Sequence, residues 1–225
     1  MGRLAAIVLS GGSGKRMNSP VPKQYMMLGD KPMLAYSLIA FEKSNVDDIV
    51  IVCREGDEDY IRTEFVSGYN LKKVHSVVKG GNERYDSVYC GLLACAEDTE
   101  YVLIHDGARP YVSDEIICRN IEGVSLYNAV VTAVTSTDTI KIADKNGFIK
   151  ETPDRSECYC MQTPQSFEYN LVLESYRKYM EEISDGSLLK VTDDAQVVEL
   201  YSDTKVKIVE GEYTNIKITN PSDLK

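Results

Sequence analysis

Hydrophobic residues are gathered into short runs that recur along the chain. Residues 4–9, 48–53, 74–78, 101–105 and 129–134 are almost continuously apolar and rich in β-branched side chains. Strands that are apolar on both faces are typical of a parallel sheet covered by helices on each side. These runs therefore predict five strands of one mostly parallel sheet.

Segments with apolar residues at helical spacing separate these runs. A first helix is expected from Asp30, whose carboxylate can cap it, with Pro32 in its first turn. A second is expected from about Asn82, and a third after Pro164 with Phe167 on its apolar face. This alternation of strands and helices predicts an α/β fold with a doubly wound sheet.

Residues 138–151 depart from this alternation. They alternate between apolar and polar side chains and contain Asn146-Gly147, a pair that favours a β-hairpin turn. Because an isolated hairpin is only marginally stable in water, this one is expected to pack on another surface, either a partner subunit or its own domain. With no internal repeat or linker, residues 1–225 are predicted to form one domain with a β-arm insertion at about 136–158.

Composition narrows the class of protein. A net charge of −10 over 225 residues argues against a general nucleic-acid binder. The six cysteines form no C-x-x-C pair and there are only two histidines, so no zinc pattern is present. No apolar run approaches the length of a membrane span, and the start is too short for a signal peptide. We therefore expect a cytoplasmic protein that binds neither membrane nor nucleic acid.

A glycine-rich and basic segment, LSGGSGKRMNSPVPKQ, follows the first predicted strand at residues 9–24. Ligands of open parallel sheets bind at the carboxyl ends of the strands, where glycine loops offer backbone N–H groups to phosphate oxygens. The segment is neither a P-loop nor a dinucleotide fingerprint, because Leu9 and Met17 stand where each requires glycine. A phosphate cradle and a tight turn with solvated basic residues both remain open for the glycines alone.

Two prolines favour the phosphate cradle. Pro20 and Pro22 stiffen the segment that carries Arg16 and Lys23, which suits a polyanion whose charge rises during reaction. At ~4 Å, one such cation is worth about 4 kcal/mol against a unit negative charge at an effective dielectric constant of roughly 20.

Motifs spread over nearly the whole chain carry a family resemblance. They are LSGGSGKRM and PKQY, GGNERYDSV (80–88), HDGARP (105–110), DTIK (138–141), TPDR (152–155), QTPQSF (162–167), TDDA (192–195) and NIKIT (215–219). In this order they resemble the 2-C-methyl-D-erythritol 4-phosphate cytidylyltransferases, a family of the sugar-phosphate nucleotidyltransferases with a Rossmann-like sheet.

The resemblance implies an enzyme that transfers CMP from CTP to 2-C-methyl-D-erythritol 4-phosphate and releases pyrophosphate, with Mg²⁺ as cofactor, in non-mevalonate isoprenoid synthesis. It also implies a homodimer in which the 138–151 arm reaches the neighbouring subunit. Two other functions compete: a ribitol-5-phosphate cytidylyltransferase, which shares most of the motifs, and a nucleotide-binding protein without catalysis. The TPDR and TDDA forms favour the methylerythritol acceptor.

The resemblance also implies roles for individual residues. Arg16 and Lys23 would hold the triphosphate and stabilise the pentacoordinate α-phosphorus. Asp106 would face the metal ion as well as the substrate. The nucleotide would be bound by Ser10, Gly11, Gly12, Ser13, Gly14, Lys15, Gly81, Asn82, Ser87, Gly107 and Thr163. The acceptor would be bound by Asp106, Arg109, Thr139, Arg155 and Lys217, some of them from across the dimer.

Structural roles compete with several of these assignments. Asp106 could instead pair with Arg109 to pin a loop, and Asp193 with Asp194 forms a helix N-cap pair more readily than a metal site. Gly107 stands where the family usually has alanine and is expected to loosen the turn after Asp106, and Asn82 stands where the family usually has aspartate. No general base is expected, because a phosphate monoester with a second pKa of about 6 is already mostly dianionic at pH 7.

Overall fold

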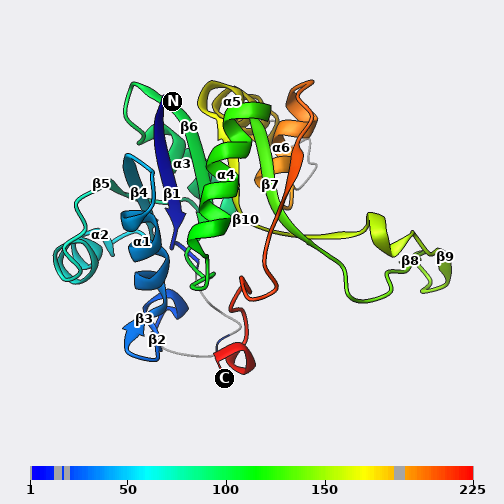
Figure 1. Ribbon diagram of the computed structural model, residues 1–225, viewed down its shortest axis with the longest axis horizontal. Helices are drawn as coiled ribbons and strands as arrows, with labels where there is room; N and C mark the ends of the chain where they lie inside the picture. Colours follow the sequence, from blue (N-terminus) through cyan, green and yellow to red (C-terminus); the bar gives the residue numbers. More distant parts are fainter. Residues whose placement is uncertain (1, 13–16, 18–20, 185–190, 225) are drawn as a thin grey trace.

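The chain folds around one seven-stranded sheet of order β11-β7-β10-β6-β1-β4-β5. The computed structural model describes residues 2–12, 17, 21–184 and 191–224 (Figure 1). Every strand predicted from an apolar run is present: β1 (Arg3–Leu9), β4 (Asp48–Cys53), β5 (Val74–Lys79), β6 (Thr99–Asp106) and β7 (Ala129–Thr135). All neighbouring pairs among β5, β4, β1 and β6 are parallel, which confirms the mostly parallel α/β fold.

Two further strands complete the sheet. β10 (Tyr159–Glu168) runs antiparallel between β6 and β7, and β11 (Lys207–Glu210) pairs in parallel with β7 at the edge. The predicted start of the third helix is therefore wrong. Phe167, which was expected on its apolar face, lies in β10, and the helix α5 spans Tyr169–Ser184. The segment extends because its backbone pairs with a strand on each side, which outweighs the local helical spacing.

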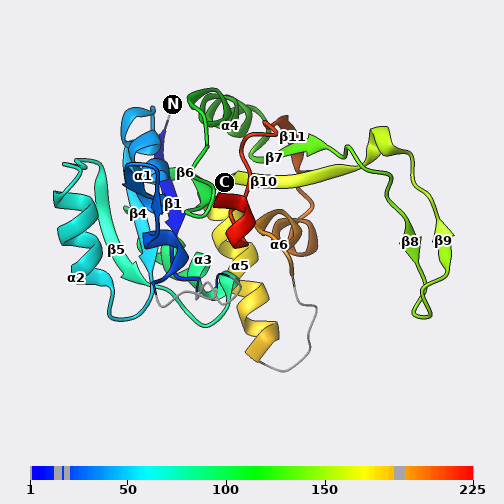
Figure 2. The same cartoon turned by 90° about the horizontal axis from the view of Figure 1, so that it is seen from below.

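Helices cover both faces of the sheet, as Figures 1 and 2 show from two directions. Because side chains alternate along a strand, Leu4, Ala6 and Val8 of β1 pack against one helical layer, and Ala5 and Ile7 against the other. The first layer holds α1 (Met33–Lys43), η3 (Ile61–Ser67), which continues the short α2 (Glu58–Tyr60), and α4 (Asp114–Tyr127). The second holds α3 (Arg84–Leu93), α5 and α6 (Asp194–Tyr201).

The first helix differs from the sequence prediction in its cap. It begins at Met33 with Pro32 at the N-cap position, so the prediction that Asp30 caps it is wrong. Residues Lys31–Pro32 form β3, which pairs with β2 (Met27–Leu28), and Asp30 lies in the turn between them. The carboxylate of Asp30 pairs with Lys31 and accepts a hydrogen bond from the Tyr36 hydroxyl at 3.0 Å. α3 begins at Arg84, two residues after the expected start.

A hairpin of β8 (Ile142–Ala143) and β9 (Ile149–Glu151) extends away from the sheet in both views (Figures 1 and 2). Gly147 has φ of +87°, as the predicted turn requires. Within residues 137–161, all of which the structure describes, no side chain is buried. The hairpin therefore does not pack on its own domain, which was one of the two surfaces expected for it.

Candidate active site

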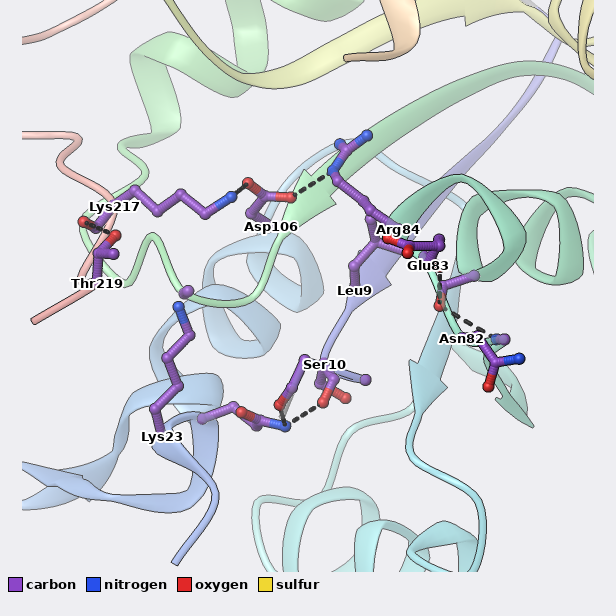
Figure 3. A pocket seen from close by; sticks show the side chains of 15 residues that line it. Leu9, Ser10, Lys23, Asn82, Glu83, Arg84, Asp106, Lys217 and Thr219 are labelled. Carbon is purple, nitrogen blue, oxygen red and sulfur yellow. Dashed lines mark hydrogen bonds and ion pairs between the residues drawn. The ribbon is translucent and has the colours of Figure 1, made fainter. Parts of the chain in front are cut away.

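A cavity of about 400 Å³ lies where β1 and β6 end (Figure 3). Its walls come from the glycine loop, the start of α3, the turn after β6 and the segment around residue 217. The lining residues are Leu9, Ser10, Gly11, Gly12, Lys23, Gln24, Gly81, Asn82, Glu83, Arg84, Ser87, Asp106, Ala108, Lys217 and Thr219. The motifs from four distant parts of the sequence thus meet at the carboxyl edge of the sheet, as parallel topology predicts.

Hydrogen bonds of two polar side chains, Ser10 and Gln24, hold the described part of the glycine loop in place. Ser10 Oγ donates to the carbonyl of Val52 at 3.0 Å, and Gln24 Nε2 donates to the carbonyl of Gly12 at 3.1 Å and to that of Ser10. Gln24 is buried in the middle of the short helix η2 (Lys23–Tyr25). It lies within the PKQY motif, but no role was predicted for it. Its amide fixes where the loop carbonyls point.

Part of the predicted cradle cannot be placed. Ser13, Gly14, Lys15 and Arg16 lie outside the described residues, so their predicted roles remain predictions. Lys23, the other predicted catalytic residue, lies in the wall of the cavity, and its Nζ donates to the carbonyl of Ile218 at 2.9 Å.

The opposite wall is formed by the turn that leads into α3. Ser87 Oγ accepts a hydrogen bond from the N–H of Gly81 at 3.2 Å and donates to the carbonyl of Glu83 at 3.2 Å. A Cβ at Gly81 would lie 2.2 Å from Cβ of Asp86, so only glycine fits there. Ser87 therefore both shapes the start of the helix and lines the cavity, and Asn82 lies exposed beside it.

Asp106, the last residue of β6, lies between two cations at the floor of the cavity (Figure 3). Its Oδ1 accepts from Arg84 Nε at 3.2 Å and its Oδ2 from Lys217 Nζ at 2.6 Å. Burial alone would raise the pKa of this carboxyl, but the charges of Arg84 and Lys217 outweigh burial and hold the pKa well below its ordinary value. Asp106 is therefore ionised and faces the cavity.

Arg109 does not form the loop-pinning side-chain pair with Asp106 that was the alternative to a ligand-facing role for Asp106. It is buried, and its guanidinium donates instead to the carbonyls of Asn215 at 2.7 Å and Met161 at 3.3 Å. These bonds tie β10 to the segment that carries Lys217. Arg109 is absent from the described wall of the cavity, so the structure gives it a supporting place beneath the site.

The turn after Asp106 is not loosened by Gly107, contrary to the sequence expectation. The N–H of Gly107 donates to the carbonyl of Leu9 at 2.9 Å, and that of Arg109 donates to the carbonyl of Asp106 at 2.9 Å. A Cβ at Gly107 would lie 2.8 Å from Cδ1 of Leu34 and 2.9 Å from the carbonyl oxygen of Leu9. The turn is held closely against the end of β1.

Comparison with known proteins identifies the family of this chain. A family model described as 2-C-methyl-D-erythritol 4-phosphate cytidylyltransferase matches residues 4–225. The chain belongs to this family. A protein of that name from Lachnoclostridium phytofermentans is 46% identical over 224 residues, covering 100% of this chain and 94% of its own. Another from Lachnospira eligens is 47% identical over 221 residues, covering 97% and 95%.

A solved structure agrees with the family assignment. The 4-diphosphocytidyl-2C-methyl-D-erythritol synthase from Anaerococcus prevotii is 37% identical and superposes with a TM-score of 0.87. The match covers 99% of this chain and 93% of that one. The resemblance carried by the ordered motifs is thereby confirmed, and the chain is a cytidylyltransferase by family.

Within this cytidylyltransferase, Thr163 lies behind Asp106 and not in the described cavity wall. Its Oγ1 accepts from the N–H of Asp106 at 3.1 Å and contacts Nδ1 of His105 at 3.1 Å, and Nε2 of His105 lies 3.2 Å from the carbonyl of Arg109. Since a carbonyl only accepts, Nε2 carries the proton, and Nδ1 accepts from the Thr163 hydroxyl. Thr163 and His105 thus hold the backbone on both sides of the catalytic-site carboxylate.

His105 should make folding stability depend on pH. Burial lowers the pKa of His105 to about 4. Between this value and the unfolded pKa of about 6.5, only the unfolded chain binds the proton, so stability falls as pH decreases through this window, by about 3 kcal/mol in total. Thermal unfolding of the wild type and of His105→Asn from pH 7 to pH 4 measures this, and the wild type should lose more stability than the variant. Equal slopes for the two proteins would contradict the prediction.

Two predicted acceptor-binding residues lie away from the cavity within one chain. Thr139 is on the exposed arm. Arg155 lies in the short helix η4 (Arg155–Glu157), donates to the carbonyl of Thr137 at 3.4 Å, and lines a separate hollow at the root of the arm. Lys217, another predicted acceptor-binding residue, lies in the main cavity.

The acidic pair at the start of α6, Asp193 and Asp194, does not line the cavity. Asp193 caps the helix by accepting from the N–H of Gln196 at 3.0 Å, which confirms the predicted N-cap. Asp194 is buried and binds Arg84 through both carboxylate oxygens, each at 2.7 Å. Sequence reasoning missed Arg84 as a site residue, although it stands in the quoted GGNERYDSV motif. Across the described residues, no group of three or more His, Cys, Asp or Glu side chains could hold a metal ion.

None of the helices in the described part of the chain has the length and apolar character needed to cross a membrane.

Proposed function

We propose that this chain transfers CMP from CTP to 2-C-methyl-D-erythritol 4-phosphate, giving 4-diphosphocytidyl-2-C-methyl-D-erythritol and pyrophosphate, with the main cavity as the CTP site. The observation that carries this proposal is the ionised Asp106 between Arg84 and Lys217, opposite the glycine loop and Lys23. Glycines of the loop and the cations Lys23, Arg84 and Lys217 line a space of about 400 Å³, which is large enough for a nucleotide and suits a triphosphate.

The reaction needs positioning and positive charge more than proton transfer. An oxygen of the acceptor phosphate attacks the α-phosphorus of CTP, the new P–O bond forms in line with the bond that breaks, and pyrophosphate leaves with that bonding pair. The attacking phosphate is dianionic near pH 7 and needs no base. His105, which directly precedes Asp106 in the sequence, is buried and neutral, and both of its ring nitrogens are hydrogen-bonded. This agrees with a mechanism without a general base.

The residues present fit a Mg²⁺ ion bound with the nucleotide. Mg²⁺ prefers oxygen ligands and is usually held by one or two carboxylates together with phosphate oxygens and water. Asp106 offers an ionised carboxylate at the cavity floor, and the remaining ligands would come from the triphosphate and water. When bound, the ion neutralises phosphate charge. Lys217 lines the same cavity, and its Nζ would bind the acceptor phosphate.

We further propose that two chains form a dimer through the arm and that Thr139 and Arg155 serve the neighbour's site. The arm exposes Ile140, Ile142, Phe148 and Ile149, of which Phe148 is 72% exposed. Such a protruding apolar hairpin gains stability by burying these side chains in another surface. In the dimer, the neighbouring subunit would supply the packing surface that the hairpin lacks in the single chain.

Mixing two inactive variants tests whether Arg155 acts in the neighbouring site. Arg155→Ala and Lys23→Ala should each be nearly inactive alone. If subunits are unfolded together and refolded as mixed dimers, one site in each mixed dimer regains both residues. Activity should then recover to roughly a quarter of wild type, because half of the dimers are mixed and each has one intact site. The readout is pyrophosphate release, with size-exclusion chromatography to confirm the dimer. No recovery despite dimer formation would place Arg155 in its own chain's site or outside catalysis.

Pyrophosphate release from CTP and Mg²⁺ tests the proposed function directly, with 2-C-methyl-D-erythritol 4-phosphate and ribitol 5-phosphate compared as acceptors. A strong preference for the first is the expected result. A preference for the second would move the acceptor assignment and leave the mechanism intact. CTP binding without turnover of either acceptor would contradict the proposed activity.

A further inference from the structure

A buried acid stands behind the wall of the cavity, at the first residue of α6. Asp194 is fully buried and accepts from Nη1 and Nη2 of Arg84, each at 2.7 Å, and from the Tyr176 hydroxyl at 2.5 Å. The backbone N–H groups of Asp194 and Ala195 donate to Oε1 of Gln165 at 3.0 and 2.9 Å. Both oxygens of the acid and its backbone are therefore fixed by neighbouring elements.

The helix itself does not require this acid. Asp193 already caps α6 through the N–H of Gln196. A buried ion pair is also a weak source of stability, because desolvation of the two charges offsets much of their attraction. Asp194 is thus better explained by what it does to its partner, Arg84, than by a need of the helix.

The guanidinium of Arg84 is planar and presents its donors as a rigid fork. Its two terminal nitrogens are held end-on by Asp194, so Nε is the atom that meets Asp106, at 3.2 Å. In Figure 3 the Arg84 side chain reaches from the start of α3 toward one oxygen of Asp106, while Lys217 approaches the other from the opposite side. The fork is fixed before any ligand arrives.

The charges explain why end-on binding matters. Asp106, Asp194, Arg84 and Lys217 together are neutral, and Asp194 is the counter-ion that Arg84 binds through two hydrogen bonds. An Arg84 released from Asp194 could turn its fork to Asp106 and form the bidentate pair that guanidinium and carboxylate groups prefer. Both oxygens of Asp106 would then be engaged by Arg84 and turned away from the cavity.

We propose that Asp194 and Tyr176 are positioning residues of the active site: they hold Arg84 end-on, so that Arg84 touches Asp106 through Nε alone. Oδ2 of Asp106 is then left to Lys217, in the wall of the cavity. This inference rests on the proposed function, in which Asp106 faces the metal and the phosphates. α5 and α6 then contribute to catalysis without touching the substrate.

Matched pairs of variants on the same helices test the proposal. Tyr176→Phe removes one hydrogen bond to Asp194 and keeps the packing, and Tyr179→Phe is its control, because Tyr179 is equally buried and its hydroxyl accepts only from the N–H of Val191 at 3.4 Å among its described bonds. Asp194→Asn removes the counter-ion of Arg84, and Asp193→Asn is its control, since asparagine also caps helices well.

Two measurements are needed, one of turnover and one of the Arg84 side chain itself. Tyr176→Phe should lower kcat by about 3-fold to 10-fold, and Asp194→Asn by at least about 30-fold, with the KM for CTP changed much less. The ¹⁵N-detected exchange rate of the Arg84 Nε–H with water should rise in both variants. Both controls should stay within about twofold of wild type in kcat and in this exchange rate.

The outcomes separate the inference from the proposed function. If Tyr176→Phe and Asp194→Asn match their controls in kcat, the acid is only structural and the proposal is overturned. If kcat falls while the Arg84 Nε–H exchange is unchanged, the residues act by another route and the proposal is also overturned. If Asp194→Asn fails to fold, Tyr176→Phe alone decides. A wild-type protein without cytidylyl transfer would contradict the proposed function. The exchange measurement would still show whether Asp194 and Tyr176 hold the guanidinium of Arg84.

Discussion

Replacing Lys23 with alanine should lower kcat by roughly 100-fold to 1,000-fold, the usual cost of removing one well-aimed donor from a charged transition state. Lys23 lies in the cavity wall on the short helix η2, and its Nζ donates to the carbonyl of Ile218. Negative charge gathers at the α-phosphorus as the acceptor phosphate attacks. An ammonium group aimed at the α-phosphorus stabilises that charge more than it stabilises bound CTP.

Steady-state kinetics with saturating acceptor measure this effect, and the loss should fall on kcat more than on the KM for CTP. Lys31→Ala is a suitable control, because Lys31 has the same side chain but pairs with Asp30 in the exposed β2–β3 turn. Near-normal turnover in Lys23→Ala would remove Lys23 from the catalytic role. An equal loss in Lys31→Ala would indicate a general effect of charge.

Asp106→Asn should lower kcat by roughly 100-fold and raise the Mg²⁺ concentration needed for half-maximal rate. Asparagine keeps the shape of the side chain and removes its charge. The local group of Asp106, Arg84 and Lys217 then changes from one net positive charge to two. Added positive charge attracts a triphosphate, so binding of CTP should be retained or strengthened while turnover fails.

The same substitution at the other end of the strand is the control. Asp98 precedes β6, pairs with Arg3 on the surface, and has a side chain that is 69% exposed. Asp98→Asn should therefore leave kcat and the Mg²⁺ dependence unchanged. An active Asp106→Asn enzyme with ordinary Mg²⁺ dependence would show that the carboxylate does not face the metal. A parallel loss of CTP binding would show a structural role instead.

The strands that sequence patterns predicted differ in what they bury from β10, which these patterns missed. β1 and β4 are runs of apolar side chains, which any hydrophobic pattern detects. The core part of β10 buries Gln162, Gln165 and Ser166, whose polarity hides the strand. Their side chains are satisfied by partners far along the chain: the carbonyl of Glu212, the start of α6, and Asn120 in α4. Such pairing depends on the fold and cannot be seen in local sequence.

Prediction from sequence has the same limit for the residues of the candidate site. Ser10, Asn82, Asp106 and Lys217 could be assigned to the cavity because the motifs of a known family carry them. Arg84 escaped notice because its importance lies in holding two acids that are 88 residues apart, Asp106 and Asp194. No spacing rule links those acids before the sheet and α6 are in place. Residues that bind ligands are thus easier to predict from sequence than the residues that aim them.

The arm between β7 and β10, in which no residue from 137 to 158 is buried, has a consequence for how this protein can be handled. A segment that adds nothing to the hydrophobic core can be cut or altered without unfolding the sheet, so limited proteolysis should cleave free subunits there. The same segment would resist cleavage once it is covered. Protease sensitivity of residues 137–158 at falling protein concentration would therefore report the assembly state of the folded chain, independently of its activity.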